Sequence, residues 1–130
     1  MAGVYLDTSS LGRLLLDERD APAIQRALSD FAARYSSRLM RVELLRLGNR
    51  EGLEERTGEV LEGISLAPID EAMLVATEAL QPATLGTLDA IHLATALRLA
   101  ERGLVDAMMT YDRRLGAAAR DHRLEVLAPV

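Results

Sequence analysis

Short, largely apolar runs alternate with longer amphipathic segments along the whole chain, and this alternation limits the fold more than any other feature. The runs comprise residues 4–6, 35–37, 64–69, 107–110 and 124–127. Each run is too short for a helix, and most are apolar or alternate between apolar and polar residues, as strands do. The segments between them carry apolar residues at helical spacing. The pattern predicts an α/β fold around a mainly parallel sheet of about five short strands.

Local signals place the ends of several helices. Ser9 or Ser10 is predicted to cap a helix that runs through residues 11–16. Gly48 is predicted to stop a helix that begins near residue 39. Thr87 begins the strongest helical pattern of the chain. The other expected helices cover residues 20–31, 51–61 and 70–80, and a last short helix follows Asp112.

The length of 130 residues and a hydrophobic content of 49% indicate one domain, residues 1–130, with its own core. With three Tyr, one Phe and no Trp, that core must be mostly aliphatic. The N-terminus has no basic segment before an apolar stretch, so we do not expect a signal peptide. No run of about 18 apolar residues is present to span a membrane. We therefore expect a cytoplasmic protein with no membrane partner.

Two residue types are missing from the sequence. The chain has no cysteine, which excludes disulfides, thiolate metal sites and cysteine nucleophiles. It also has no lysine, which excludes Schiff-base chemistry and lysine-dependent phosphate loops. Phosphatases of the haloacid-dehalogenase type and receiver domains also place aspartates at strand ends, but both rely on a lysine. The phosphatases need a second aspartate where this chain has Ser9.

Four carboxylates lie at ends of elements or among apolar residues. Asp7 and Asp112 follow apolar runs, and in a parallel sheet the carboxyl ends of strands line the ligand crevice. Asp89 lies in the first turn of a helix, and Glu43 has apolar neighbours in mid-helix. Each alone has an ordinary explanation as a turn residue, a cap, a helix-terminal charge or a half-exposed residue. Together they predict a site for Mg²⁺ or Mn²⁺, because converging carboxylates repel one another without a cation.

Four stretches with distinctive residues follow one another along the chain. They are VYLDTS at 4–9, RVELLR at 41–46, LDAIHLATA at 88–96 and MTYDRRL at 109–115. In this order and spacing they resemble the PIN-domain family, and in detail the VapC toxins of type II toxin–antitoxin pairs. The stretch at 88–96 is the most specific of the four.

The resemblance implies a three-layer α/β/α sandwich and a metal-dependent endoribonuclease that typically cleaves tRNA or ribosomal RNA. It implies that Asp7, Glu43, Asp89 and Asp112 form an acidic quartet around one or two Mg²⁺ or Mn²⁺ ions. It also implies a small VapB-like antitoxin that blocks the cleft, together with a homodimer or a toxin–antitoxin hetero-oligomer. The alternative is a PIN-like module that binds RNA or protein without cleaving RNA.

Within the quartet we expect Asp7 and Asp89 to bind the cation directly, followed by Asp112. Glu43 is expected to be a further ligand or the residue that orients the attacking water.

Hydroxyl groups and histidines near the quartet have less specific signals. Thr8, Ser9 and Thr110 are candidates for positioning the carboxylates, although turns and caps also explain the two N-terminal hydroxyls. His92 follows Asp89 by one helical turn and is interpreted as a packed or hydrogen-bonded structural residue. His122 is expected at the surface.

The basic charge of the chain is concentrated in one segment. Residues 34–50 contain five arginines and one acidic residue, a net charge of +4 in a chain whose net charge is −5. Residues 51–78 carry a net charge of −7. Guanidinium groups match phosphate oxygens, although ion pairs on a solvated surface are an equally good explanation for any one arginine. The candidates for contacts to RNA phosphates are Arg41, Arg46, Arg113 and Arg114.

Overall fold

The computed structural model describes residues 2–130. The strands are β1 Gly3–Leu6, β2 Ala33–Ser37, β3 Ile64–Ala67, β4 Ala107–Met109 and β5 Glu125–Leu127. The helices are α1 Thr8–Leu15, α2 Ala21–Leu28, α3 Arg38–Glu51, α4 Glu54–Leu61, α5 Glu71–Glu78, α6 Thr87–Glu101 and α7 Arg113–Asp121. Within residues 2–130, none of these helices combines the length and the apolar character that a membrane crossing requires.

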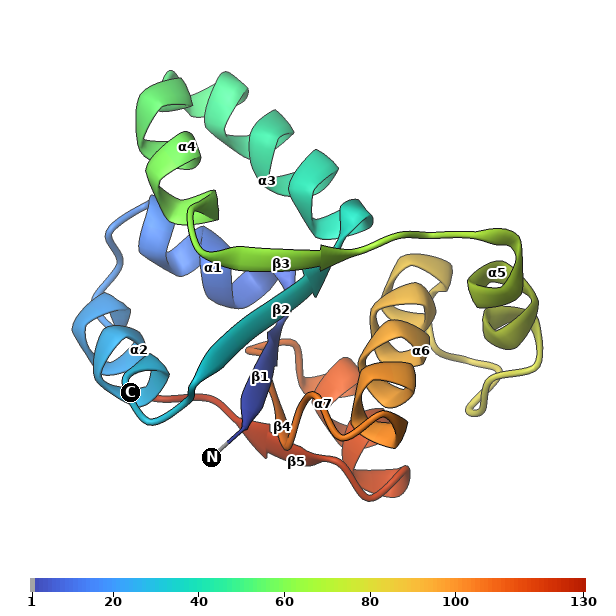
Figure 1. Cartoon of the computed structure of the whole chain (residues 1–130). Helices are drawn as coiled ribbons and strands as arrows, with labels where there is room; N and C mark the ends of the chain where they lie inside the picture. Colours follow the sequence, from blue (N-terminus) through green and yellow to red (C-terminus); the bar gives the residue numbers. More distant parts are fainter. Residues whose placement is uncertain (1) are drawn as a thin grey trace.

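The five strands form one parallel sheet in the order β3-β2-β1-β4-β5 (Figure 1). From β1 the chain adds β2 and β3 on one side, and it then returns to place β4 and β5 on the other side. The strand order therefore reverses between β1 and β4, and open parallel sheets form ligand crevices at the carboxyl ends of such strands. The predicted sheet is confirmed, and β3 lies at its edge and ends before Pro68, as expected.

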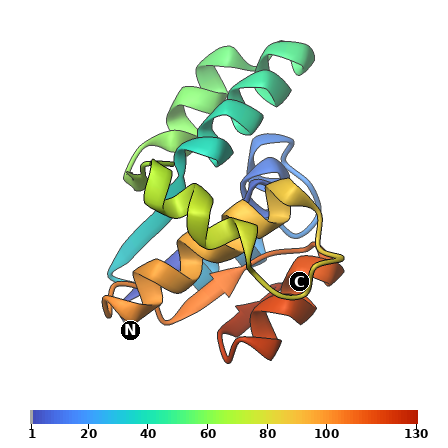
Figure 2. The same cartoon turned by 90° about the vertical axis from the view of Figure 1, so that its right-hand side faces the viewer.

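Helices cover both faces of the sheet, because alternate residues of a strand point to opposite sides. Val4 and Leu6 of β1 belong to an apolar core with residues of α1, α2 and α3. Tyr5 points the other way, into a core with residues of α6 and α7. Helix α5 lies outside this layer and packs against α6 (Figure 2). The result is the expected three-layer α/β/α arrangement.

The predicted cap of the first helix is wrong. The cap is Asp7, whose carboxylate accepts a hydrogen bond from the backbone N–H of Ser10 at 3.0 Å. Helix α1 therefore begins at Thr8, earlier than the expected start after Ser9 or Ser10. Strand β1 ends at Leu6, and Asp7 keeps the extended backbone that an N-cap requires before the helix begins at Thr8.

The predicted end of the third helix is also wrong. Helix α3 continues past Gly48 to Glu51 and ends at Gly52, which has a φ of +70°. Gly48 instead permits close packing between helices, since a Cβ at this position would overlap Thr57 Oγ1 in α4. A glycine that serves a contact of this kind leaves the helix intact around it.

Candidate active site

The four predicted carboxylates converge at the carboxyl edge of the sheet, although they come from separate segments. Asp7 follows β1 and Asp112 precedes α7, whereas Asp89 and Glu43 lie within the first two turns of α6 and α3. The pKa of Asp89 is raised by partial burial and then by the negative charge of Asp112, with smaller contributions from Asp7 and Glu43. All four groups are therefore close enough to interact electrostatically.

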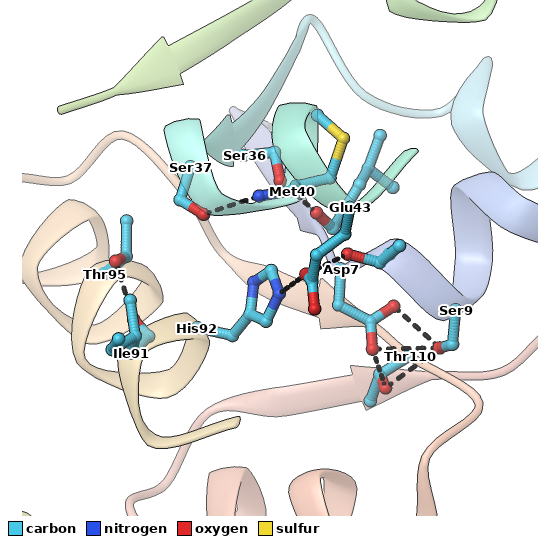
Figure 3. A network of polar contacts seen from close by, with 12 residues as sticks. Asp7, Ser9, Ser36, Ser37, Met40, Glu43, Ile91, His92, Thr95 and Thr110 are labelled. Atoms are coloured by element: carbon cyan, nitrogen blue, oxygen red, sulfur yellow. Dashed lines mark hydrogen bonds and ion pairs between the residues drawn. The ribbon is translucent and has the colours of Figure 1, made fainter. Parts of the chain in front are cut away.

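Asp7 is built into the fold. The residue is 3% exposed, and both carboxylate oxygens accept hydrogen bonds (Figure 3). Oδ1 accepts from the backbone N–H of Ser10 at 3.0 Å and from the hydroxyls of Ser9 at 2.8 Å and Ser10 at 3.2 Å. Oδ2 accepts from the hydroxyls of Thr110 at 2.5 Å and Ser9 at 2.9 Å. Ser9 has a single hydroxyl proton shared between the two oxygens, so the carboxylate is held by the backbone N–H of Ser10 and by hydroxyls of Ser9, Ser10 and Thr110.

The hydroxyls of Ser9 and Thr110 also join Asp7 to the segment that carries Asp112. Ser9 Oγ accepts a hydrogen bond from the backbone N–H of Tyr111 at 2.9 Å. Thr110 Oγ1 accepts from the backbone N–H of Asp112 at 3.1 Å. Each hydroxyl thus donates to Asp7 and accepts from the chain that follows β4. The two loops at the point of strand reversal are fixed to each other through these contacts.

Glu43 is held through one of its two oxygens. Oε1 accepts a hydrogen bond from Thr8 Oγ1 at 2.6 Å and lies 3.0 Å from His92 Nε2. No residue among 2–130 forms a hydrogen bond with Oε2. Partial burial raises the pKa of Glu43, but the hydrogen bonds from His92 and Thr8 outweigh it and lower the pKa overall. Glu43 is therefore an ionised carboxylate at neutral pH with one oxygen available.

Asp89 and Asp112 make few contacts. Asp112 Oδ1 caps α7 by accepting from the backbone N–H of Leu115 at 3.0 Å. Within residues 2–130, Asp89 forms no hydrogen bond or ion pair, and neither does Oδ2 of Asp112. We call Asp89 and Asp112 the open pair, since no other segment donates a hydrogen bond to them. We call Asp7 and Glu43 the locked pair, since side chains from other segments hold both.

The donor chemistry of the open pair fits a hard divalent cation. No group of three or more His, Asp or Glu side chains in the described chain is arranged to hold a metal ion by itself. Mg²⁺ does not require one, because proteins bind it through one or two carboxylates with waters and substrate phosphates. The open pair supplies such carboxylates without competing partners. Asp7 stays a predicted ligand together with Asp89, and its oxygens also accept hydrogen bonds from neighbouring residues.

The arginines predicted to contact phosphates lie close in the sequence to Glu43 or to Asp112. Within residues 2–130, no ion pair or hydrogen bond involves the side chains of Arg41, Arg46, Arg113 or Arg114. Arg13 differs from them, because its guanidinium group lies 4.0 Å from the centre of the Tyr111 ring and pairs with two acidic side chains. These four guanidinium groups are therefore available to an anionic ligand, as are other arginines of the described chain that form no ion pair, such as Arg34 and Arg38.

His92 is hydrogen-bonded, as expected, but its partner is one of the four carboxylates. Its Nε2 lies 3.0 Å from Glu43 Oε1, and its Nδ1 lies 2.7 Å from the hydroxyl of Tyr5. His92 follows Asp89 by three residues, so the two side chains lie on the same side of α6. This spacing is the one sequence signal that indicates a position of His92 near the carboxylates. The partners lie on β1 and α3, which no local pattern identifies. The sequence pattern indicates only that Tyr5 belongs to an apolar strand.

Comparison with known proteins gives concordant results. The PIN domain model matches residues 4–121. Ribonuclease VapC46 of Mycobacterium tuberculosis is 37% identical over 131 residues, which cover 99% of this chain and 99% of the relative. A toxin–antitoxin complex from Klebsiella pneumoniae contains a chain of the same fold, with a TM-score of 0.75, 23% identity and 98% coverage of both chains.

A second solved structure extends this likeness in fold. It is VapC20 of Mycobacterium tuberculosis, described as a toxin that cleaves the sarcin–ricin loop, with a TM-score of 0.68 and 13% identity. The match covers 88% of this chain and 94% of that one. With a family model over most of the chain and a relative of 37% identity along its whole length, the chain belongs to the PIN domain family.

Proposed function

We propose that this protein is an endoribonuclease that acts as the toxin of a type II toxin–antitoxin pair. The full-length likeness to Ribonuclease VapC46 supports this assignment. The observation that carries it is the convergence of four carboxylates at the point of strand reversal, with Asp89 and Asp112 unpaired by other segments. Clustered carboxylates that hold divalent cations are a recurring means of hydrolysing phosphodiesters.

The proposed cofactor is Mg²⁺ or Mn²⁺, as one or two ions held chiefly by the open pair. Bound there, a divalent cation would supply a water of lowered pKa and would neutralise charge on the phosphate. The free Oε2 of Glu43 would orient the attacking water or accept its proton, and Glu43 is also a candidate ligand. Asp7 is a further proposed ligand, and it would also hold the loops after β1 and β4 in position.

The hydroxyl groups have separate positioning roles in this proposal. Thr8 holds Glu43, whereas Ser9 and Thr110 hold Asp7 and connect it to the backbone next to Asp112. Such hydrogen bonds keep carboxylates oriented and are expected to matter nearly as much as the carboxylates themselves.

The proposed substrate is RNA, with tRNA and ribosomal RNA as the target classes. The overall charge of −5 opposes RNA binding, so local positive charge must offset it. Arg41, Arg46, Arg113 and Arg114 are the proposed phosphate contacts, because each lies within three residues of Glu43 or Asp112 and lacks a partner in the described chain.

The proposed protein partner is a small VapB-like antitoxin that covers the carboxylates. The support is the likeness in fold to a chain of the Klebsiella pneumoniae toxin–antitoxin complex. A homodimer, alone or within a larger hetero-oligomer with the antitoxin, is the proposed assembly.

Cleavage of a labelled tRNA and rRNA pool tests the proposal directly. The purified protein is incubated with Mg²⁺ or Mn²⁺, with and without EDTA, beside Asp89→Asn and the exposed control Asp121→Asn. We expect cleavage by the wild type and by Asp121→Asn, and none with EDTA or with Asp89→Asn. Equal cleavage by Asp89→Asn would identify a contaminating nuclease. Binding of RNA without cleavage by any form would favour the non-catalytic module.

A further inference from the structure

A chain of hydrogen bonds leads from the interior of the sheet to Glu43. The Tyr5 hydroxyl lies 2.7 Å from His92 Nδ1, and His92 Nε2 lies 3.0 Å from Glu43 Oε1. Tyr5 is 0% exposed and His92 is 3% exposed. The side chain of His92 extends from α6 towards Glu43 of α3 (Figure 3). A fully buried hydroxyl is thus two hydrogen bonds away from a partly exposed carboxylate at the carboxyl edge of the sheet.

The chemistry of these groups determines which atom carries each proton. An ionised Glu43 only accepts hydrogen bonds, so His92 Nε2 must donate to it. In a neutral imidazole the other nitrogen is then an acceptor, and the Tyr5 hydroxyl must donate to Nδ1. Burial raises the pKa of Tyr5, so its hydroxyl keeps the proton that this arrangement requires. The Tyr5 hydroxyl thereby satisfies Nδ1 in the tautomer of His92 that supports Glu43.

Stability of the fold does not explain this arrangement. The ring of Tyr5 packs in an apolar cluster that includes Leu93, Met108 and Leu115, while the hydroxyls of Ser36 and Ser37 lie close to its own hydroxyl. Replacing both partners of a buried hydrogen bond by apolar groups of the same shape is nearly neutral for stability. A phenylalanine and an aliphatic residue would therefore serve the core as well as Tyr5 and His92. The contact that such a core would lose is the one to Glu43.

We propose that Tyr5 and His92 are positioning residues that hold Glu43 through Oε1, so that Oε2 faces the cleft. This inference rests on the proposed nuclease function. Thr8 and His92 approach the same oxygen from α1 and α6, which leaves Glu43 one orientation. The buried hydroxyl of Tyr5 acts on the reaction through His92, without touching the substrate.

The test uses Tyr5→Phe, His92→Gln and His92→Met in the full chain. The side-chain amide of glutamine can donate a hydrogen bond to Glu43 as Nε2 does, whereas methionine cannot. Tyr35→Phe is the matched control, because Tyr35 is paired with Tyr5 in β2 and its hydroxyl has no hydrogen bond within the described residues. For each variant we measure kcat and KM on one RNA and the melting temperature. The protonated nitrogen of His92 is measured by nitrogen-15 NMR in the wild type, Tyr5→Phe and Tyr35→Phe.

We expect Tyr5→Phe to lower kcat about tenfold and His92→Met about 10- to 100-fold, with KM changed less than about twofold. His92→Gln should recover most of the loss, and Tyr35→Phe should match the wild type. A kcat of Tyr5→Phe equal to that of the wild type would overturn the proposal. So would equal losses of kcat in His92→Gln and His92→Met that follow a fall in their melting temperatures.

The NMR measurement separates this inference from the proposed function. If the wild type cleaves no RNA, the nuclease assignment fails, but the spectrum still reports the protonated nitrogen of His92. The inference requires a proton on Nε2 in the wild type and a changed Nδ1 nitrogen-15 shift in Tyr5→Phe, where Nδ1 loses its hydrogen-bond donor. A wild-type spectrum with the proton on Nδ1 would contradict it whatever the activity.

Discussion

The locked pair and the open pair contain the same kind of group but are treated differently by the fold. Asp7 is buried and its oxygens accept hydrogen bonds from Ser9, Ser10 and Thr110, the last of which follows β4. Asp89 is half-buried and has no hydrogen-bond partner in the described chain. The contrast separates two tasks, since a carboxylate whose oxygens are occupied stabilises the structure, and an unpaired one remains available to a ligand.

The electrostatics follow the same division. Hydrogen bonds from His92 and Thr8 overcome the effect of burial and lower the pKa of Glu43, so its charge is supported by the fold. Burial and the nearby Asp112 raise the pKa of Asp89, so its charge is opposed by the fold. A group kept charged against its surroundings is a candidate for function, because stability does not account for it.

The largest expected effect is on catalysis by the open pair. Asp89→Asn should lower kcat/KM for RNA by about 100- to 1000-fold, because it removes a charge placed where the reaction needs it. Its melting temperature should equal or exceed that of the wild type, since one source of repulsion is gone. Cleavage assays and thermal unfolding check both statements, and Asp121→Asn should change neither. A strongly lowered melting temperature would show that Asp89 belongs with the locked pair.

The same substitution in the locked pair should have the opposite effect on stability. Asp7→Asn places an amide N–H₂ where donors already point, and we expect it to lower the free energy of unfolding by about 3 kcal/mol. Urea denaturation of Asp7→Asn and Asp89→Asn side by side measures the difference. Equal free energies for the two variants would remove the distinction between the pairs.

A smaller loss of stability is expected when only one hydroxyl that donates to the locked pair is removed. Thr110→Val keeps the shape of the side chain but removes a donor to Asp7 and an acceptor for the N–H of Asp112. We expect it to cost about 1–2 kcal/mol. Thr95→Val is the control, since Thr95 is also buried but its hydroxyl donates only to Ile91 O in the same helix. Comparable losses of unfolding free energy in both variants would show that the cost comes from replacing a buried threonine and not from losing the hydrogen bond to Asp7.

The smallest expected effect is a difference in pH dependence, below about 1 kcal/mol because both groups are partly exposed. Glu43 has a lowered pKa in the folded state, so its contribution to stability is lost as the pH falls through that pKa. Asp89 has a raised pKa, so its effect on stability becomes less favourable as the pH rises through it. The free energy of unfolding of the wild type, Glu43→Gln and Asp89→Asn is measured across the acidic pH range. As the pH rises, the wild type should gain stability relative to Glu43→Gln and lose stability relative to Asp89→Asn.

The sequence predicts the fold well because the signals involved are local. Strand β1 and the long helix α6 each follow from a few adjacent residues. The errors arise where local signals are ambiguous or where a distant residue decides. Residues 7–10 can all cap a helix, and the end of β1 selects Asp7 among them. Gly48 looks like a helix stop, but its role depends on Thr57 in another helix.

The candidate site divides in the same way. Asp7, Asp112 and Asp89 are recognisable from their positions after strands and in the first turn of a helix. Glu43 is recognisable from its apolar neighbours in mid-helix. Which of them keep free oxygens is not recognisable, because the donors that decide it come from far along the chain. Thr110 lies 103 residues from Asp7, and His92 lies 49 residues from Glu43. The sequence therefore groups Asp7 with Asp89, whereas the hydrogen bonds group Asp89 with Asp112.

Binding of Mn²⁺ to the wild type and to Asp89→Asn, measured by isothermal titration calorimetry without RNA, tests the central claim most directly. The open pair should bind the ion, so Asp89→Asn should lose at least about tenfold in affinity while its melting temperature without metal is not lowered. Wild-type Mn²⁺ affinity in Asp89→Asn would contradict the assignment of the cation to the open pair.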